Sequence, residues 1–136
     1  MDSLGGHLAE VKRLQPLRVL LAGRDRRYIR VTSFLLEQRG YAVRSSTIGA
    51  AAEAARRHRS DVVLLEGDKL RSEAARNAAA IEALNPNARV IVVVDKQPTE
   101  WAGMATLPKW IELERIVDTL EAGSDGFPDR DVDPAA

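Results

Sequence analysis

The sequence predicts an α/β protein, a doubly wound fold in which helices cover both faces of a five-stranded parallel sheet. Short, nearly continuous apolar runs alternate along the chain with longer segments of helical periodicity. The run 90–94 consists of five β-branched residues, which is typical of a central parallel strand buried on both faces. Because right-handed crossovers place helices on either side of such a sheet, this alternation favours the doubly wound arrangement.

The first half of the chain predicts two strand and helix pairs. The apolar run 17–22 indicates a buried strand. Residues 25–39 carry apolar side chains at helical spacing and are followed by Gly40, so we expect a helix that ends there. Alternating residues around 41–45 predict the second strand, and the second helix is expected over 49–59.

The second half repeats this pattern and ends in a helix. Val- and Leu-rich residues 61–65 predict the third strand, and the Ala-rich segment 72–84 predicts a helix ended by the following Asn-Pro pair. The fourth strand is the run 90–94. A short fifth strand is expected at about 105–107, and a last helix over 111–122 has its apolar side chains on one face.

The predicted elements define one domain with two short extensions. We expect an N-terminal extension at 1–16, the domain itself at 17–122 and a C-terminal tail at 123–136. Gly123 provides a stop for the last helix. The tail is rich in Asp and Pro, and this composition predicts disorder.

The composition excludes several classes of function. The 20 basic and 20 acidic residues give a net charge of zero, which argues against nucleic-acid binding by this domain and against an anionic membrane surface. There is no cysteine, no isolated apolar run long enough to span a bilayer and no secretion signal, so we expect a cytoplasmic protein. His7 and His58 lack partners at ligand spacing, so neither a metal nor a cofactor is expected.

Four segments within 17–122 resemble the receiver domain of bacterial two-component response regulators. They are VLLAGRD through LLEQRGYAV (19–43), DVVLLE (61–66), ALNPNARVIVVV (83–94) and LPKW (107–110). They occur in the family's order and with nearly its spacing up to Val94. The resemblance implies a flavodoxin-like sheet with strand order 2-1-3-4-5.

The functional positions depart from those of a working receiver. The family places a carboxylate pair after strand one to hold Mg²⁺, an Asp nucleophile at the end of strand three, a hydroxyl residue at the end of strand four and a Lys before the last helix. Here these positions carry Gly23, Arg24, Glu66, Val94 and Lys109. Since Mg²⁺ requires oxygen ligands and an Arg repels it, we expect a degenerate receiver without phosphoacceptor chemistry.

Glu66 and Arg24 admit two interpretations. In the first, Glu66 accepts charge-assisted hydrogen bonds from Lys109, and Arg24 supplies the positive charge that Mg²⁺ supplies in active family members. A permanent ion-pair network would then hold the surrounding loops in one arrangement. In the second, Arg24 is a solvated loop residue and Glu66 an ordinary carboxylate at a strand end. A Glu66 carboxylate far from both Lys109 and Arg24 would exclude the first interpretation.

The segment before Lys109 is shorter than its counterpart in the family. Val94 and Lys109 are 15 positions apart, and the intervening residues include Pro98 and Gly103, both poor helix formers. We therefore expect the family's fourth helix to be shortened or missing.

Three large side chains in this region are candidates for contact with a partner protein: Trp101, Met104 and Trp110. Trp and Met are enriched in the buried centres of interfaces. The alternative for Trp101 is that it covers the sheet where helix four is missing.

The sequence thus favours a phosphorylation-independent regulatory or interaction module that binds another protein or itself as a homodimer. The alternative is a sensor of a small molecule, which would require a pocket lined by Gly23, Glu66 and Trp101. An enzyme is the least supported class, because no Gly-rich phosphate loop and no nucleophile with a paired base is visible.

Overall fold

The computed structural model describes residues 15–67, 70–95 and 104–132, with side chains described up to Ala122. The described residues form a five-stranded parallel sheet and four helices, and the predicted strand order is confirmed as β2-β1-β3-β4-β5. Residues 96–103, where the shortened or missing fourth helix is predicted, lie outside the described residues, as does Trp101. No helix in the described part of the chain has both the length and the apolar character needed to cross a membrane.

The elements lie within a few residues of their predicted positions, except at the end of the last helix. The strands are β1 (Arg18–Ala22), β2 (Ala42–Ser46), β3 (Val62–Glu66), β4 (Arg89–Val94) and β5 (Thr106–Pro108). The helices are α2 (Arg26–Gln38), α3 (Ala51–His58), α4 (Arg71–Leu84) and α5 (Leu113–Val132). Pro108 is tolerated at the end of β5 because this strand forms one edge of the sheet.

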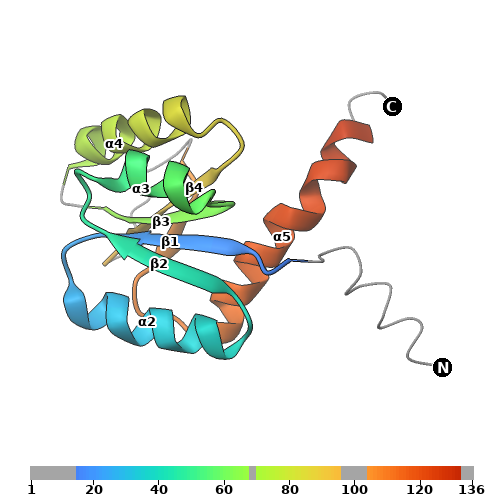
Figure 1. Cartoon of the computed structure of the whole chain (residues 1–136), viewed down its shortest axis with the longest axis horizontal. Helices are drawn as coiled ribbons and strands as arrows, with labels where there is room; N and C mark the ends of the chain where they lie inside the picture. The colour runs from blue at the N-terminus through green and yellow to red at the C-terminus, as the bar shows by residue number, and fades with distance from the viewer. Residues whose placement is uncertain (1–14, 68–69, 96–103, 133–136) are drawn as a thin grey trace.

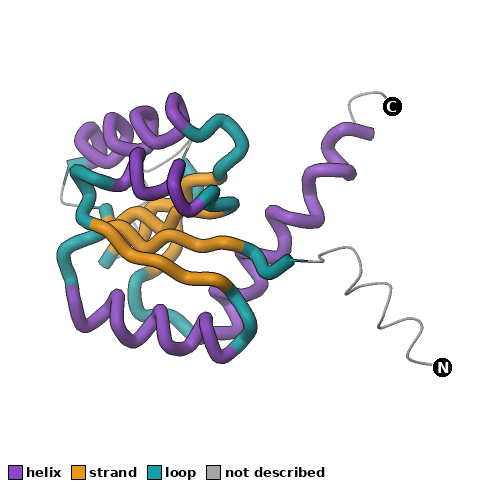
Figure 2. The backbone as a smooth tube through the Cα atoms, viewed as in Figure 1, coloured by secondary structure: helices purple, strands orange, loops and turns teal. Residues whose placement is uncertain are grey.

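Helices cover both faces of the sheet and create two apolar cores (Figures 1 and 2). On one face, Leu36 of α2 and Leu120 of α5 pack against a cluster that includes Val19 of β1. On the other face, α3 and α4 contribute small residues such as Ala51 and Ala74, which allow the helices to approach the sheet closely. The central strands β1, β3 and β4 are buried on both faces, which explains their nearly unbroken apolar sequences.

The predicted end of the last helix at Ala122 is wrong. α5 continues to Val132, so residues 124–132, which the composition places in a disordered tail, are helical. The expected stop rests on Gly123, but a glycine ends a helix by adopting a positive φ. Among the described residues the glycine in that conformation is Gly40, with φ 93°, directly after α2 and its C-cap Arg39. Glycine alone lowers helix propensity without ending the helix.

Candidate functional site

The parallel strands bring their carboxyl ends to one edge of the sheet, where four of the five predicted site residues meet. Glu66 is the last residue of β3, Gly23 and Arg24 follow β1 directly, and Lys109 follows β5. A backbone hydrogen bond of 2.7 Å from Lys109 N to Val94 O fixes the start of the last loop to β4. The sheet therefore positions these residues by register rather than by local sequence.

The Glu66 side chain folds back over the loop that follows β1. Its Oε1 accepts hydrogen bonds from the backbone N–H of Arg24 at 2.5 Å and of Asp25 at 3.1 Å. Its Oε2 accepts a hydrogen bond from Lys109 Nζ at 2.8 Å. The predicted hydrogen bond between Glu66 and Lys109 is therefore present, and both carboxylate oxygens are engaged.

Gly23 makes this arrangement possible because it has no side chain. A Cβ atom added at this position would lie 2.7 Å from Glu66 Cβ and closer still to Glu66 Oε1, within the volume that the Glu66 side chain occupies. Glu66 therefore fills the space that a side chain at position 23 would need. The two residues are compatible only as a pair.

Lys109 is the cation at the centre of the site. Its side chain is 9% exposed, and its Nζ lies 2.7 Å from Asp25 Oδ2, 2.8 Å from Glu66 Oε2 and 3.7 Å from Asp95 Oδ1. It also lies over the Tyr28 ring, 5.6 Å from the ring centroid. Because Asp95 is largely exposed, water screens its attraction, and the two short ion pairs dominate.

The sequence interpretation did not single out Asp25 for a role, although this residue joins the site to α2. Its Oδ1 accepts a hydrogen bond from Tyr28 N at 3.1 Å and caps the helix, while its Oδ2 pairs with Lys109. The signal that could have found it is its place as the N-cap of α2, three residues after the end of strand β1. One carboxylate thus holds both a helix start and the central lysine.

The charges of the site stabilise one another. Partial burial raises the pKa of Glu66, but the hydrogen bonds from Lys109 and from the backbone of Asp25 and Arg24 outweigh this effect and hold the pKa below its ordinary value. The hydrogen bond from Lys109 is the main cause of the lowered pKa of Asp25. Burial lowers the pKa of Lys109, yet its pairing with the two carboxylates raises that pKa well above the ordinary lysine value.

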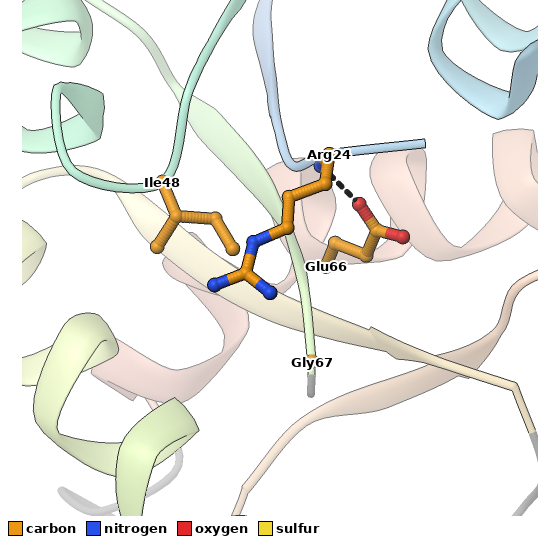
Figure 3. Close-up of a pocket in the computed structure, with 4 residues that line it drawn as sticks. All are labelled: Arg24, Ile48, Glu66 and Gly67. Atoms are coloured by element: carbon orange, nitrogen blue, oxygen red, sulfur yellow. Dashed lines mark hydrogen bonds between the residues drawn. The ribbon is translucent and has the colours of Figure 1, made fainter. Parts of the chain in front are cut away.

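Arg24 contributes to the site differently from the sequence interpretation. Its backbone N–H binds Glu66, while its guanidinium extends past Ile48 and away from the Glu66 carboxylate (Figure 3). These residues and Gly67 line a small pocket with a volume of about 40 Å³. The positive charge beside Glu66 is thus that of Lys109, and the Arg24 side chain forms part of the pocket wall.

The remaining predicted residues that the structure describes add no charged or hydrogen-bonding side chain to the ion pairs of Lys109. Val94 is buried in the core on the α3 and α4 side and offers no hydroxyl group. Met104 packs, partly buried, against the same core. Trp110 is 58% exposed, and its ring makes an edge-to-face contact with Tyr28 at 5.5 Å between centroids. A contact role for Trp101, Met104 and Trp110 stays a prediction.

The residues at this edge do not fit the Mg²⁺ ion that the resemblance implies for a working receiver. Position 23 provides no side-chain oxygen, and a larger side chain there would collide with Glu66. The oxygens of Glu66 and Asp25 already bind Lys109 and backbone N–H groups. Within the described residues, no group of three or more His, Cys, Asp or Glu side chains could hold a metal ion.

Comparison with known proteins identifies the fold. No family model and no curated protein matches the chain. Among solved structures, a CheY-like response regulator receiver domain protein from Methanospirillum hungatei is similar, with a TM-score of 0.71 and 19% identity over 82% of this chain and 95% of that one.

Two bacterial structures agree with this likeness. A response regulator from Desulfuromonas acetoxidans has a TM-score of 0.70 and 11% identity over 82% of this chain and 98% of that one. A response regulator receiver protein from Sinorhizobium medicae has a TM-score of 0.62 and 17% identity over 77% and 91% of the two chains. The chain therefore has the fold of the CheY-like receiver domains of response regulators.

Proposed function

We propose that this chain is a receiver-like regulatory module of bacterial signalling or transcription control that acts by binding proteins and has no metal-dependent phosphoacceptor chemistry. Receiver domains generally regulate rather than catalyse, and the fold is theirs. The observation that carries the proposal is the Glu66 side chain in the space above Gly23. It replaces a metal-binding side chain at the position where the resemblance places one.

The chemistry of phosphoryl transfer supports this proposal. Transfer to a carboxylate requires neutralisation of the charge that spreads over the phosphoryl oxygens, a task that Mg²⁺ performs in the resembling family. Here Lys109, the cation that pairs with Glu66, is also shared with Asp25. An attack by Glu66 would first have to break its hydrogen bonds to two backbone N–H groups and to Lys109.

The same contacts support a site whose loop arrangement is permanent and does not depend on phosphorylation. Lys109 follows β5, Glu66 ends β3 and Asp25 follows β1, so two ion pairs connect three segments of the sheet edge without a phosphoryl group. The bond between Lys109 and Glu66 is the better shielded of the two, because these side chains are 9% and 15% exposed, whereas water screens the pair with Asp25 more strongly. Together the two pairs favour the connected arrangement of the three segments.

Acetyl phosphate labelling tests the loss of phosphoacceptor chemistry. The protein is incubated with acetyl phosphate with and without Mg²⁺, and its intact mass is measured alongside that of a receiver with a complete acidic pair. We expect no added phosphoryl group on this chain in either condition. A stoichiometric, Mg²⁺-dependent adduct on Glu66 would overturn the proposal.

Substitution of the central carboxylate tests the interaction role. Glu66→Gln keeps the shape of the side chain but weakens its bond to Lys109, so capture of protein partners from the native host should change. Glu82→Gln, on the exposed side of α4, is the matched control and should leave capture unchanged. Identical partner capture by wild type and Glu66→Gln would contradict a role for this network in binding.

The pocket lined by Arg24, Ile48, Glu66 and Gly67 favours a second candidate function, a sensor of a small ligand. Its volume of about 40 Å³ accommodates a few water molecules at most, whereas ligand sites usually enclose about 300–1,000 Å³. The predicted third wall, Trp101, lies outside the described residues. This function is therefore less well supported than protein binding.

A further inference from the structure

The exposed side of α2 carries positive charge that the fold does not use. Arg26, Arg27 and Arg30 are exposed, and the first turn of the helix contains no acidic residue. None of the three pairs with an acidic side chain in the described part of the chain. Because the N-terminal end of a helix already carries a partial positive charge, arginines there disfavour the helix. Their presence suggests a role outside the fold itself.

Exposed apolar side chains lie beside these arginines. Val31 is 39% exposed, and Phe34, three residues further along the same face of α2, is 58% exposed. Trp110 is exposed to the same extent and contacts Tyr28, which lies one helical turn before Val31. We call the basic and apolar residues together the α2 surface: Arg26, Arg27, Arg30, Val31, Phe34 and Trp110. Exposed apolar groups with a charged rim are typical of protein-binding sites.

The C-terminal segment 124–136 has the complementary composition. It contains four aspartates, at positions 125, 129, 131 and 133, against one arginine, together with Phe127 and Val132. The exposed start of α2 is thus basic and the C-terminal segment acidic, although the chain as a whole is neutral. Such a segment matches the α2 surface in both charge and apolar content.

A second copy of the chain is better placed than the same copy to supply this segment. α2 follows β1 and α5 follows β5, so both helices start from the carboxyl edge of the parallel sheet and run away from it. In Figure 1 the C-terminal end of α5 lies at the opposite end of the molecule from the first turn of α2. The described end of α5 in one molecule is therefore remote from the first turn of its own α2.

We propose that the α2 surface binds the acidic C-terminal segment of a second copy of this chain, so that two molecules exchange segments and form a closed dimer. The proposal rests on the proposed function of the chain as an interaction module. In such a reciprocal dimer, the α2 surface and the C-terminal segment of each molecule are both occupied. No binding surface is then left to add a third molecule. The contact combines charge attraction with burial of Phe34 and Trp110.

Light scattering coupled to size-exclusion chromatography tests this proposal on the full chain. We expect a dimer at low salt whose dissociation constant rises about tenfold or more between about 50 mM and about 500 mM NaCl, because salt screens contacts between exposed charges. A wild-type protein that stays monomeric at low salt over the whole accessible concentration range would overturn the proposal.

Two charge-reversal variants separate the two sides of the contact. Variant one carries Arg27→Glu and Arg30→Glu, and variant two carries Asp129→Lys and Asp131→Lys. Each variant alone faces like charges across the contact and should be monomeric, whereas an equimolar mixture should form a heterodimer in which both contacts are attractive again. Dimers of either variant alone, or a mixture that remains monomeric, would contradict the exchange.

A matched control keeps the test specific. Arg57→Glu with Arg76→Glu makes the same change of charge on the exposed surfaces of α3 and α4, on the other face of the sheet, and should leave the dimer intact. Loss of the dimer in this control as well would show a general charge effect and overturn the proposed surface. A monomeric wild type that takes up no phosphoryl group would remove the dimer but leave the proposed function standing.

Discussion

Replacing Gly23 by alanine is the smallest change that tests how the site is built. The added Cβ atom would lie 2.7 Å from Glu66 Cβ and closer to its Oε1, distances that no relaxed structure keeps. Gly23 does not have a positive φ, so alanine fits the backbone here and the effect is purely steric. Glu66 must therefore move away from the loop after β1.

The expected cost follows from the contacts that Glu66 would lose. Moving its carboxylate breaks the hydrogen bonds from Arg24 N and Asp25 N and disturbs the one from Lys109. Hydrogen bonds to charged groups contribute about 1.5–3 kcal/mol each, and water replaces part of this at a partly exposed edge. We expect Gly23→Ala to lower the free energy of unfolding by about 2–3 kcal/mol.

Urea unfolding followed by circular dichroism measures this change, and a second glycine provides the control. Gly49 also lacks a positive φ, and a Cβ added there meets no atom within 4 Å. Gly49→Ala should therefore change stability by less than about 1 kcal/mol, in the stabilising direction, because alanine restricts the unfolded chain.

A double-mutant cycle assigns the cost to Glu66 itself. A Glu66→Ala background keeps the Cβ contact but removes the contacts with the carboxylate group, so the further change Gly23→Ala should cost at least about 1 kcal/mol less than in the wild type. A Gly23→Ala protein as stable as the wild type would refute the reasoning, since Glu66 could then not occupy the space above residue 23. An equal cost in both backgrounds would refute the assignment to the Glu66 carboxylate.

Three further expectations concern the same site. Lys109→Met should lower the unfolding free energy at pH 7 by about 2 kcal/mol, because Glu66 keeps a partly buried charge without its cation, and the loss should shrink near pH 3 in urea titrations. The folded-state pKa values of Glu66 and Asp25 lie below their ordinary values, so their stabilisation is present above about pH 4.5 and is lost as the pH falls through the folded-state values. Acid titration should show this loss, and Glu66→Gln should flatten it. Burial raises the pKa of Tyr28 to about 12, so stability should fall as the pH rises from about 10 to 12, and Tyr28→Phe should remove this fall and the late tyrosine absorbance change.

The fold could be predicted because its main signals are local. Buried parallel strands such as β4 show as short β-branched runs, and helices such as α2 show as periodic segments with a cap and a terminal glycine. The error at the end of α5 has the opposite origin. Whether Gly123 ends a helix depends on the φ that it adopts, and composition alone does not determine that angle.

The site could be predicted only in part, because two of its features depend on tertiary contacts between residues far apart in the sequence. The pairing of Glu66 with Lys109 follows from the register of two strand ends, which the resemblance supplies. The Glu66 side chain folds onto the backbone of the loop after β1 because Gly23 leaves space there. No sequence pattern around Gly23 or Glu66 indicates this orientation. The sequence does not single out Asp25, because an Asp before a helix is already accounted for by its capping role.

Gly23 and Glu66 are best understood as one joint departure from the pattern of a working receiver. A carboxylate at position 23 alone would collide with Glu66, and a shorter carboxylate at position 66 alone would leave position 23 without an oxygen ligand. Under the proposed function, neither single change would build a cation site, so a metal site at this edge would require changes at both positions. Lys109 strengthens this interdependence, because it holds Glu66 and Asp25 together and would be left with fewer partners after either single change.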